Sequence, residues 1–184
     1  MAVIFFRAGS DCTQDWQAFS IFTESTVMKA ASASEIKKEL KTLEHKDLVE
    51  LCLRLSRYKK ENKELLTFLL YEADNLPHYI ASVKEELDEI FAGVNTSSVF
   101  FAKKTIRKAL RTANKYIRYA GDKTVEIEIL LHFCTDFQGM RLDWKRSSLL
   151  SRIYDNQVKK IAAAIETLHE DLQYDYRRSF DRLK

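Results

Sequence analysis

The sequence of 184 residues is poor in the residues that break helices, since it holds only four glycines and one proline. β-Sandwiches, β-barrels and Rossmann-type sheets use many turns marked by glycine and proline, so this scarcity argues against all three. None of the glycines lies in a pattern that cradles phosphate groups. The composition therefore favours helices joined by short links.

The sequence also has few cysteines and no long apolar run. Cys12, Cys52 and Cys134 are far apart and odd in number, which indicates neither a disulfide framework nor a zinc site. The apolar start, Ala2–Phe6, is shorter than the core of a signal peptide, and no stretch approaches the ~20 apolar residues of a membrane span. We therefore expect a cytoplasmic protein that does not enter a membrane.

Charge of one sign is not in excess over the whole chain. Lysine and arginine total 30 and aspartate and glutamate total 27, which gives a formal net charge of +3. That balance is too even to indicate a nucleic-acid partner by itself.

Residues 1–27 differ from the rest because they are rich in aromatic residues and have no sustained period. Two interpretations stay open: an upstream extension outside the core, or an arm that packs its aromatic side chains onto the body. Residues 28–184 read as an all-helical domain.

Apolar residues at spacings of three and four predict helices along most of residues 28–184. Examples are the segments 98–119, ending at Gly121, and 123–139, capped by Asp122. Val125–Ile129 alternates like a strand, but Val125, Ile129 and Phe133 recur at i+4, so we prefer a helix. The predicted fold is all-α, one domain of six to eight helices in antiparallel hairpins, as an irregular bundle or a short α-hairpin stack.

The strongest local feature is a basic stretch between Lys103 and Lys123, with Asp122 as its only acid. Lys103, Arg107, Arg111 and Lys115 recur at i+4 and form one ridge on the predicted helix. Two tyrosines follow near its end. The candidate binding ridge comprises Lys103, Lys104, Arg107, Lys108, Arg111, Lys115, Tyr116, Arg118 and Tyr119.

Three interpretations of this ridge stay open. It can face acidic neighbours, for which the candidates are Glu85, Glu86, Asp88 and Glu89 before it and Glu126 and Glu128 after it. It can hold phosphates and stack bases on its tyrosines. It can also dock another acidic partner.

The C-terminal segment, predicted as one helix over 147–183, carries a second candidate site. Its apolar residues follow heptad spacing and form a seam for helix pairing: Tyr154, Val158, Ile161, Ile165, Leu168 and Leu172. The seam either packs inside the domain or pairs with a second chain or partner.

The sequence offers no catalytic, cofactor-binding or metal-ligating set. His45, His78, His132 and His169 lie on four separate elements, and His132 and Cys134 fall on different faces of one helix. We expect no cofactor, and an enzyme is the least favoured interpretation. The feature that would distinguish an enzyme is a polar pocket that brings a histidine together with a cysteine or carboxylates, and the sequence spacing offers none.

The segments Leu51–Leu66, Lys103–Lys108 and Lys115–Tyr119 resemble a small all-helical bacterial family of unknown function, over about residues 33–140. The resemblance implies an all-helical fold and transfers no catalytic residue. The preferred function is a non-enzymatic helical interaction module that binds protein, either a partner or a second copy. The alternative is a nucleic-acid-binding protein that uses the basic helix 103–123.

Overall fold

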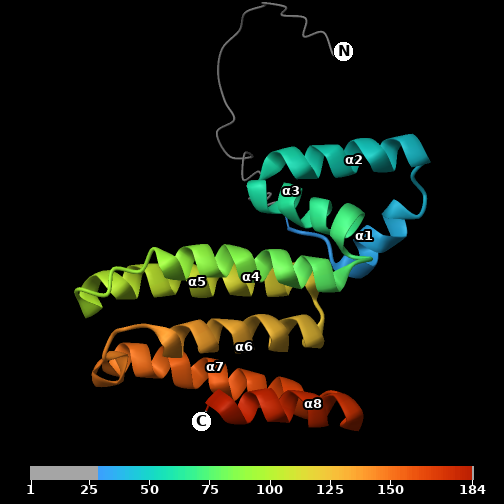
Figure 1. The fold of residues 1–184 in the computed structure, drawn as a ribbon. Coiled ribbons are helices and arrows are strands. Elements are labelled where there is room, and N and C mark those ends of the chain that lie inside the picture. Colours follow the sequence, from blue (N-terminus) through green and yellow to red (C-terminus); the bar gives the residue numbers. More distant parts are fainter. Residues whose placement is uncertain (1–28, 184) are drawn as a thin grey trace, which may run out of the picture. The chain divides into compact units, whose positions relative to one another are not determined.

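The structure, a computed structural model, describes residues 29–183. The two interpretations of residues 1–27 therefore lie outside the described residues. The chain divides into two compact units, one that ends at Leu48 and one that begins at Val49. Residues 29–183 contain eight α-helices and no strand, which confirms the all-α prediction of six to eight helices (Figure 1).

The first unit contains helix α1 (Ala33–Leu40) and the start of α2 (His45–Tyr58). Helix α1 begins with a capping box, in which the Ser32 hydroxyl accepts from the Glu35 amide and the Glu35 carboxylate accepts from the Ser32 amide. The glutamate three residues after Ser32 makes this reciprocal cap possible.

The second unit contains the rest of α2 and the six remaining helices. They are α3 (Lys60–Thr67), α4 (Leu76–Ala92), α5 (Val99–Ala120), α6 (Lys123–Gly139), α7 (Ser148–Glu166) and α8 (Glu170–Phe180). A π-helical turn, Phe68–Glu72, follows α3, and short 3₁₀ turns, Trp144–Arg146 and Asp181–Leu183, precede α7 and follow α8.

From α4 onward, most helices pack on the next helix in the chain, and α4 also packs on α6. Lys84 and Asp88 of α4 contact Glu128 and His132 of α6, so both pairs join residues 44 apart. The order is the same on both helices, which means that α4 and α6 run parallel with α5 as the antiparallel return. This arrangement is what the predicted hairpins require.

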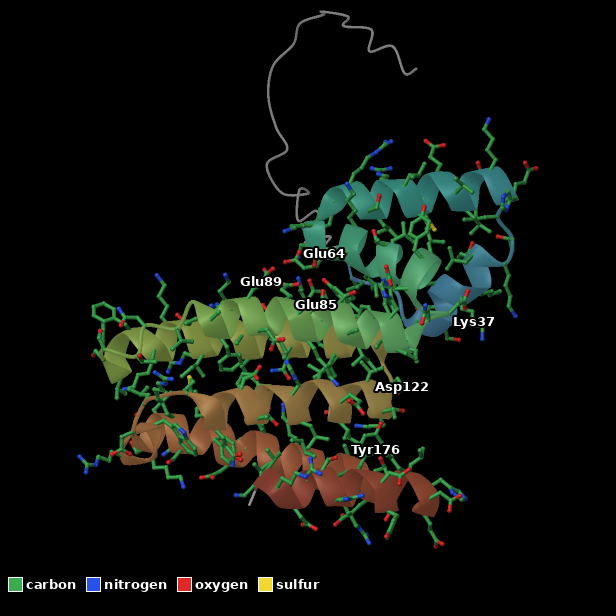
Figure 2. The ribbon with its side chains drawn as sticks, viewed as in Figure 1. Lys37, Glu64, Glu85, Glu89, Asp122 and Tyr176 are labelled. Atoms are coloured by element: carbon green, nitrogen blue, oxygen red, sulfur yellow. The ribbon has the colours of Figure 1, made fainter. Side chains whose placement is uncertain are left out.

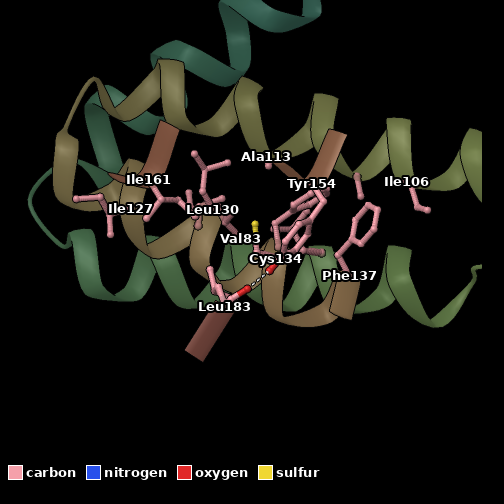
Figure 3. Close-up of a cluster of buried hydrophobic side chains, with 14 of the residues drawn as sticks. Val83, Ile106, Ala113, Ile127, Leu130, Cys134, Phe137, Tyr154, Ile161 and Leu183 are labelled. Carbon is pink, nitrogen blue, oxygen red and sulfur yellow. Dashed lines mark hydrogen bonds between the residues drawn. The ribbon is translucent and has the colours of Figure 1, made fainter. Parts of the chain in front are cut away.

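The core of the second unit is centred on α6, which presents buried side chains on most of its circumference. Val125, Ile129, Phe133 and Phe137 are fully buried, as their i+4 spacing predicted for a helix. Figure 3 shows the core around Cys134, whose burial raises the pKa of its thiol to about 12. At the edge of the core, the Tyr154 hydroxyl donates to the Leu183 carbonyl at 2.7 Å.

The predicted continuous helix over 147–183 is wrong, because the chain leaves the helical path after Glu166. The amides of Thr167 and Leu168 still donate to Ala164 and Ile165, and His169 is extended with φ −64° and ψ 149°. The Gln173 side chain donates to the Leu168 carbonyl at 2.8 Å, which satisfies one carbonyl that the break leaves free. Helix α8 then packs on α7.

The link between α5 and α6 gives a direct stability test. Gly121 ends α5 in the left-handed region at φ 62°. Gly121→Ala should lower the free energy of unfolding by about 1–2 kcal/mol, because a Cβ is strained at this φ even though no atom lies within 4 Å of it. Gly139→Ala is the matched control, since Gly139 has open space and no positive φ. Equal urea midpoints for the two variants would contradict the assignment.

Candidate functional site

The basic ridge lies on α5, which is the longest helix of the second unit and strongly two-sided. Ser98 caps its start, and Gly121 ends it. Ala102, Ile106, Ala109 and Ala113 are buried on one face, at spacings of four, three and four. Three alanines and one isoleucine pack that face against the core, and the long basic side chains lie on the rest of the helix surface.

The structure places the predicted ridge residues in two groups. The fully exposed ones are Lys104, Arg107, Lys108, Arg111 and Arg118. The partly buried ones are Lys103, Lys115, Tyr116 and Tyr119. The exposed group lies mainly in the first two-thirds of α5, whereas three of the four partly buried residues lie near its C-terminal end.

Most cations of the ridge have no acidic partner among the described residues. Within residues 29–183, the only ion pairs in the basic stretch join Lys115 to Glu64 at 2.9 Å and Lys123 to Glu126 at 2.8 Å. No salt bridge involves Lys103, Lys104, Arg107, Lys108, Arg111 or Arg118 in that part of the chain.

Of the acidic residues that the sequence suggested as neutralising partners, Glu126 pairs with Lys123 at the end of the basic stretch, and the others bind elsewhere or stay in solvent. Glu128 pairs with Lys84 at 2.6 Å, and Asp88 contacts His132 at 2.7 Å. Glu86 accepts from the Tyr116 hydroxyl. Glu85 and Glu89 stand exposed on α4 (Figure 2). The neutralisation interpretation therefore applies to Lys115 and not to the first half of the ridge.

The C-terminal end of the ridge faces carboxylates, so its tyrosines do not extend the cationic surface. The hydroxyls of Tyr116 and Tyr119 donate to Glu86 and Glu64 at 2.6 and 3.0 Å. Burial and the carboxylate of Glu64 raise the pKa of Tyr119 to about 12. The Lys115 ammonium lies over the Tyr116 ring at 4.3 Å and lowers the pKa of Glu64. Both tyrosine hydroxyls therefore donate hydrogen bonds within the protein.

The N-terminal end of α5 presents two aromatic side chains that the sequence analysis did not assign to the site. Phe100 and Phe101 are 76% and 55% exposed, and their rings meet edge to face at 5.6 Å. They line an open hollow together with Lys103, Lys104, Arg107, Leu110 and Arg111. The sequence does contain this signal, because the two phenylalanines lie only three and two positions before Lys103.

A second open hollow lies between α5 and α7. Arg107 and Leu110 form its α5 side, and Arg152, Ile153 and Asn156 are among its α7 residues. Arg152 is exposed and has no ion pair within the described range. We call this continuous region the α5 surface, defined by Phe100, Phe101, Lys103, Lys104, Arg107, Lys108, Leu110, Arg111 and Arg152.

The structure divides the predicted pairing seam between core and surface. Tyr154, Ile161 and Ile165 are at most 6% exposed, whereas Leu172 on α8 is 42% exposed. Val158 and Leu168 are partly buried. Burial within the same chain favours the internal-packing interpretation for α7, and pairing with a second chain stays a prediction.

The structure also brings together a histidine and two carboxylates that the sequence analysis did not connect. His132 and Asp136 are one turn apart on α6, and Asp88 reaches them from α4. The spacing of four between His132 and Asp136 was a signal in the sequence, since it places both side chains on one face of a helix. The contact with Asp88 required the parallel packing of α4 and α6.

Comparisons of the chain with known protein families, with characterised proteins and with solved structures find no match. The all-helical character implied by the resemblance to a bacterial family is confirmed, and the comparisons add no family to it. Among the described residues, no helix combines the length and the apolar character that a membrane crossing requires.

Proposed function

We propose that the protein is a non-enzymatic interaction module whose α5 surface binds an acidic, amphipathic segment of a partner protein. The observation that carries the proposal is the group of cations from Lys103 to Arg111 without an ion pair in residues 29–183, set beside exposed phenylalanines. Like charges at i+4 repel along a helix, so this arrangement costs α5 stability unless an anionic partner compensates it.

The mixture of charge and apolar surface indicates the chemistry of the partner. Phe100, Phe101 and Leu110 are the apolar residues that line the hollow on α5. Its other lining residues are the cations Lys103, Lys104, Arg107 and Arg111. An amphipathic helix with acidic residues beside its apolar stripe matches both features, because it buries the phenyl rings and pairs the cations in one contact. Arginine and exposed aromatic residues are also the side chains that most often dominate such contacts.

Fluorescence anisotropy with two labelled peptides tests this function. One peptide forms an acidic amphipathic helix, and the other carries the same charge without an apolar stripe. The double substitution Phe100→Ser with Phe101→Ser should weaken binding of the amphipathic peptide by more than about tenfold, because burial of one phenyl side chain is worth about 1.5–3 kcal/mol. The purely polar peptide should keep its affinity. Failure of the wild-type protein to bind either peptide at low salt would overturn the proposal.

Single-stranded nucleic acid is the second candidate, and the exposed Phe100–Phe101 pair next to unpaired cations favours it. Aromatic rings stack bases without sequence preference, and lysines and arginines contact phosphates. Arg107→Ala with Arg111→Ala should then reduce the log–log salt slope for a labelled oligonucleotide by about 1.4, at about 0.7 per phosphate contact. If the protein binds the oligonucleotide more tightly than the amphipathic peptide, nucleic-acid binding replaces protein binding as the proposed function.

A further inference from the structure

Three potential metal ligands converge on the face between α4 and α6. The His132 Nε2 atom lies 2.7 Å from Asp88 Oδ1 and 3.3 Å from Asp136 Oδ2. One ligand atom from each of the three side chains lies within 4.8 Å of the others. Two helices therefore supply one imidazole nitrogen and two carboxylate oxygens to a single point.

The parallel packing of α4 and α6 holds this cluster in register. One turn earlier on both helices, Lys84 and Glu128 form an ion pair at 2.6 Å. Next to the cluster on the core side, the rings of Phe91 and Phe133 meet at 5.4 Å. The Lys84–Glu128 ion pair and the Phe91–Phe133 contact both join α4 to α6. They fix the register of the two helices, so the positions of the three ligands do not depend on a loop.

The protein's own hydrogen bonds leave one oxygen of the cluster unsatisfied. The Nε2 atom of an imidazole carries at most one hydrogen, and its short contact is with Asp88. Asp136 Oδ2 is buried and has no hydrogen-bond partner within the described residues, although Nε2 is near it. A dication would contact all three ligand atoms where one hydrogen can serve only one carboxylate.

The donor set indicates which class of ion fits. Imidazole nitrogen suits Zn²⁺, Co²⁺, Ni²⁺ and related first-row ions, and carboxylate oxygen also binds them, whereas Mg²⁺ and Ca²⁺ prefer all-oxygen sites. Three protein ligands leave at least one coordination position for water. Asp88 is 56% exposed at its side chain, so an ion and its water have access from solvent.

We propose that Asp88, His132 and Asp136 form a binding site for one first-row divalent transition-metal ion that joins α4 to α6. The site is separate from the α5 surface and does not depend on the proposed function. Its chemistry is coordination alone: the Nε2 lone pair and one oxygen of each carboxylate bind the ion, and His132 carries its hydrogen on Nδ1 when the ion is bound.

Isothermal titration calorimetry with Zn²⁺ tests the site on the full chain. Cys12→Ser and Cys52→Ser are included in every sample, so that the buried Cys134 is the only thiol left. We expect one ion per chain and a rise in Tm of about 5–10 °C when Zn²⁺ is present at about a hundred times its Kd. Asp88→Asn and Asp136→Asn should each weaken Zn²⁺ binding by more than about tenfold.

The matched control is the exposed pair His169 and Asp171, which has a comparable N–O distance of 3.4 Å but no second carboxylate partner among residues 29–183. His169→Ala with Asp171→Asn should leave the Zn²⁺ affinity unchanged. Asp88→Asn keeps the test decisive even if a substitution at the partly buried His132 prevents folding, since Asp88 is exposed. Visible absorption of bound Co²⁺ reports the same losses independently of heat.

Two results would overturn the metal site. The first is the absence of binding at millimolar Zn²⁺, which would leave the cluster as a polar contact between His132 and two aspartates. The second is stoichiometric binding that persists at full strength in both Asp88→Asn and Asp136→Asn, which would place the ion elsewhere on the chain.

Discussion

Ile165→Asp is expected to unfold the second unit of the protein. Ile165 is 2% exposed in α7, within a core cluster that also contains the buried Ile161 and Tyr154. An unpaired carboxylate placed there loses its hydration, and the lost apolar contacts add to that cost, which together exceed about 5 kcal/mol. Since the total stability of a domain is about 5–15 kcal/mol, most or all of it would be lost.

Far-ultraviolet circular dichroism and thermal unfolding measure this effect. Leu172→Asp is the matched control, because Leu172 belongs to the same predicted seam but is 42% exposed on α8. It should leave a cooperative transition with a Tm near that of the wild type. A folded monomer from Ile165→Asp, together with a dimeric wild type in light scattering, would instead show that the seam pairs between chains.

Helix ends were the most predictable part of the fold, because local chemistry determines them. Gly121 and Asp122 stop α5 and start α6 as expected, with Asp122 accepting from the amides of Thr124 and Val125 (Figure 2). Asn75 caps α4, and Pro77 lies in its first turn. Each of these features needs only residues within a few positions of one another.

The break between α7 and α8 was not predictable in the same way. The seam spacing continues through Leu168 to Leu172, and neither glycine nor proline marks the interruption. The end of α8 returns to α7, where the Leu183 carbonyl accepts from Tyr154. That long-range contact, and the packing of Phe180 and Leu183 into the core, decide against one straight helix.

The candidate site shows the same division between local and distant information. The i+4 row of cations and its placement on one helix could be predicted, since both follow from helical periodicity. The partner of Lys115 could not, because Glu64 comes from α3. Arg152 from α7 and Asp88 beside His132 also depend on how helices pack, which no spacing within one helix reveals.

Reversal of two charges on the α5 surface should abolish most of its binding. Arg107→Glu with Arg111→Glu places two carboxylates at exposed positions without ion pairs in the described chain. Their repulsion of an acidic partner costs several kcal/mol, so affinity for the acidic amphipathic peptide should fall by at least about a hundredfold at low salt. The same variant should unfold at nearly the wild-type temperature, because no existing salt bridge is broken.

Lys37→Glu with Lys38→Glu provides the control for net charge. Both lysines are exposed in the last turn of α1, and their reversal changes the total charge by the same amount. If pairing with the cations of the α5 surface, and not overall charge, attracts the peptide, this control should bind it within about threefold of the wild type, since Lys37 and Lys38 are not part of that surface. Equal losses in the two double variants would mean that overall charge, and not the α5 surface, attracts the peptide. An unchanged affinity in Arg107→Glu with Arg111→Glu would leave the unpaired cations of α5 as a solvated helix face.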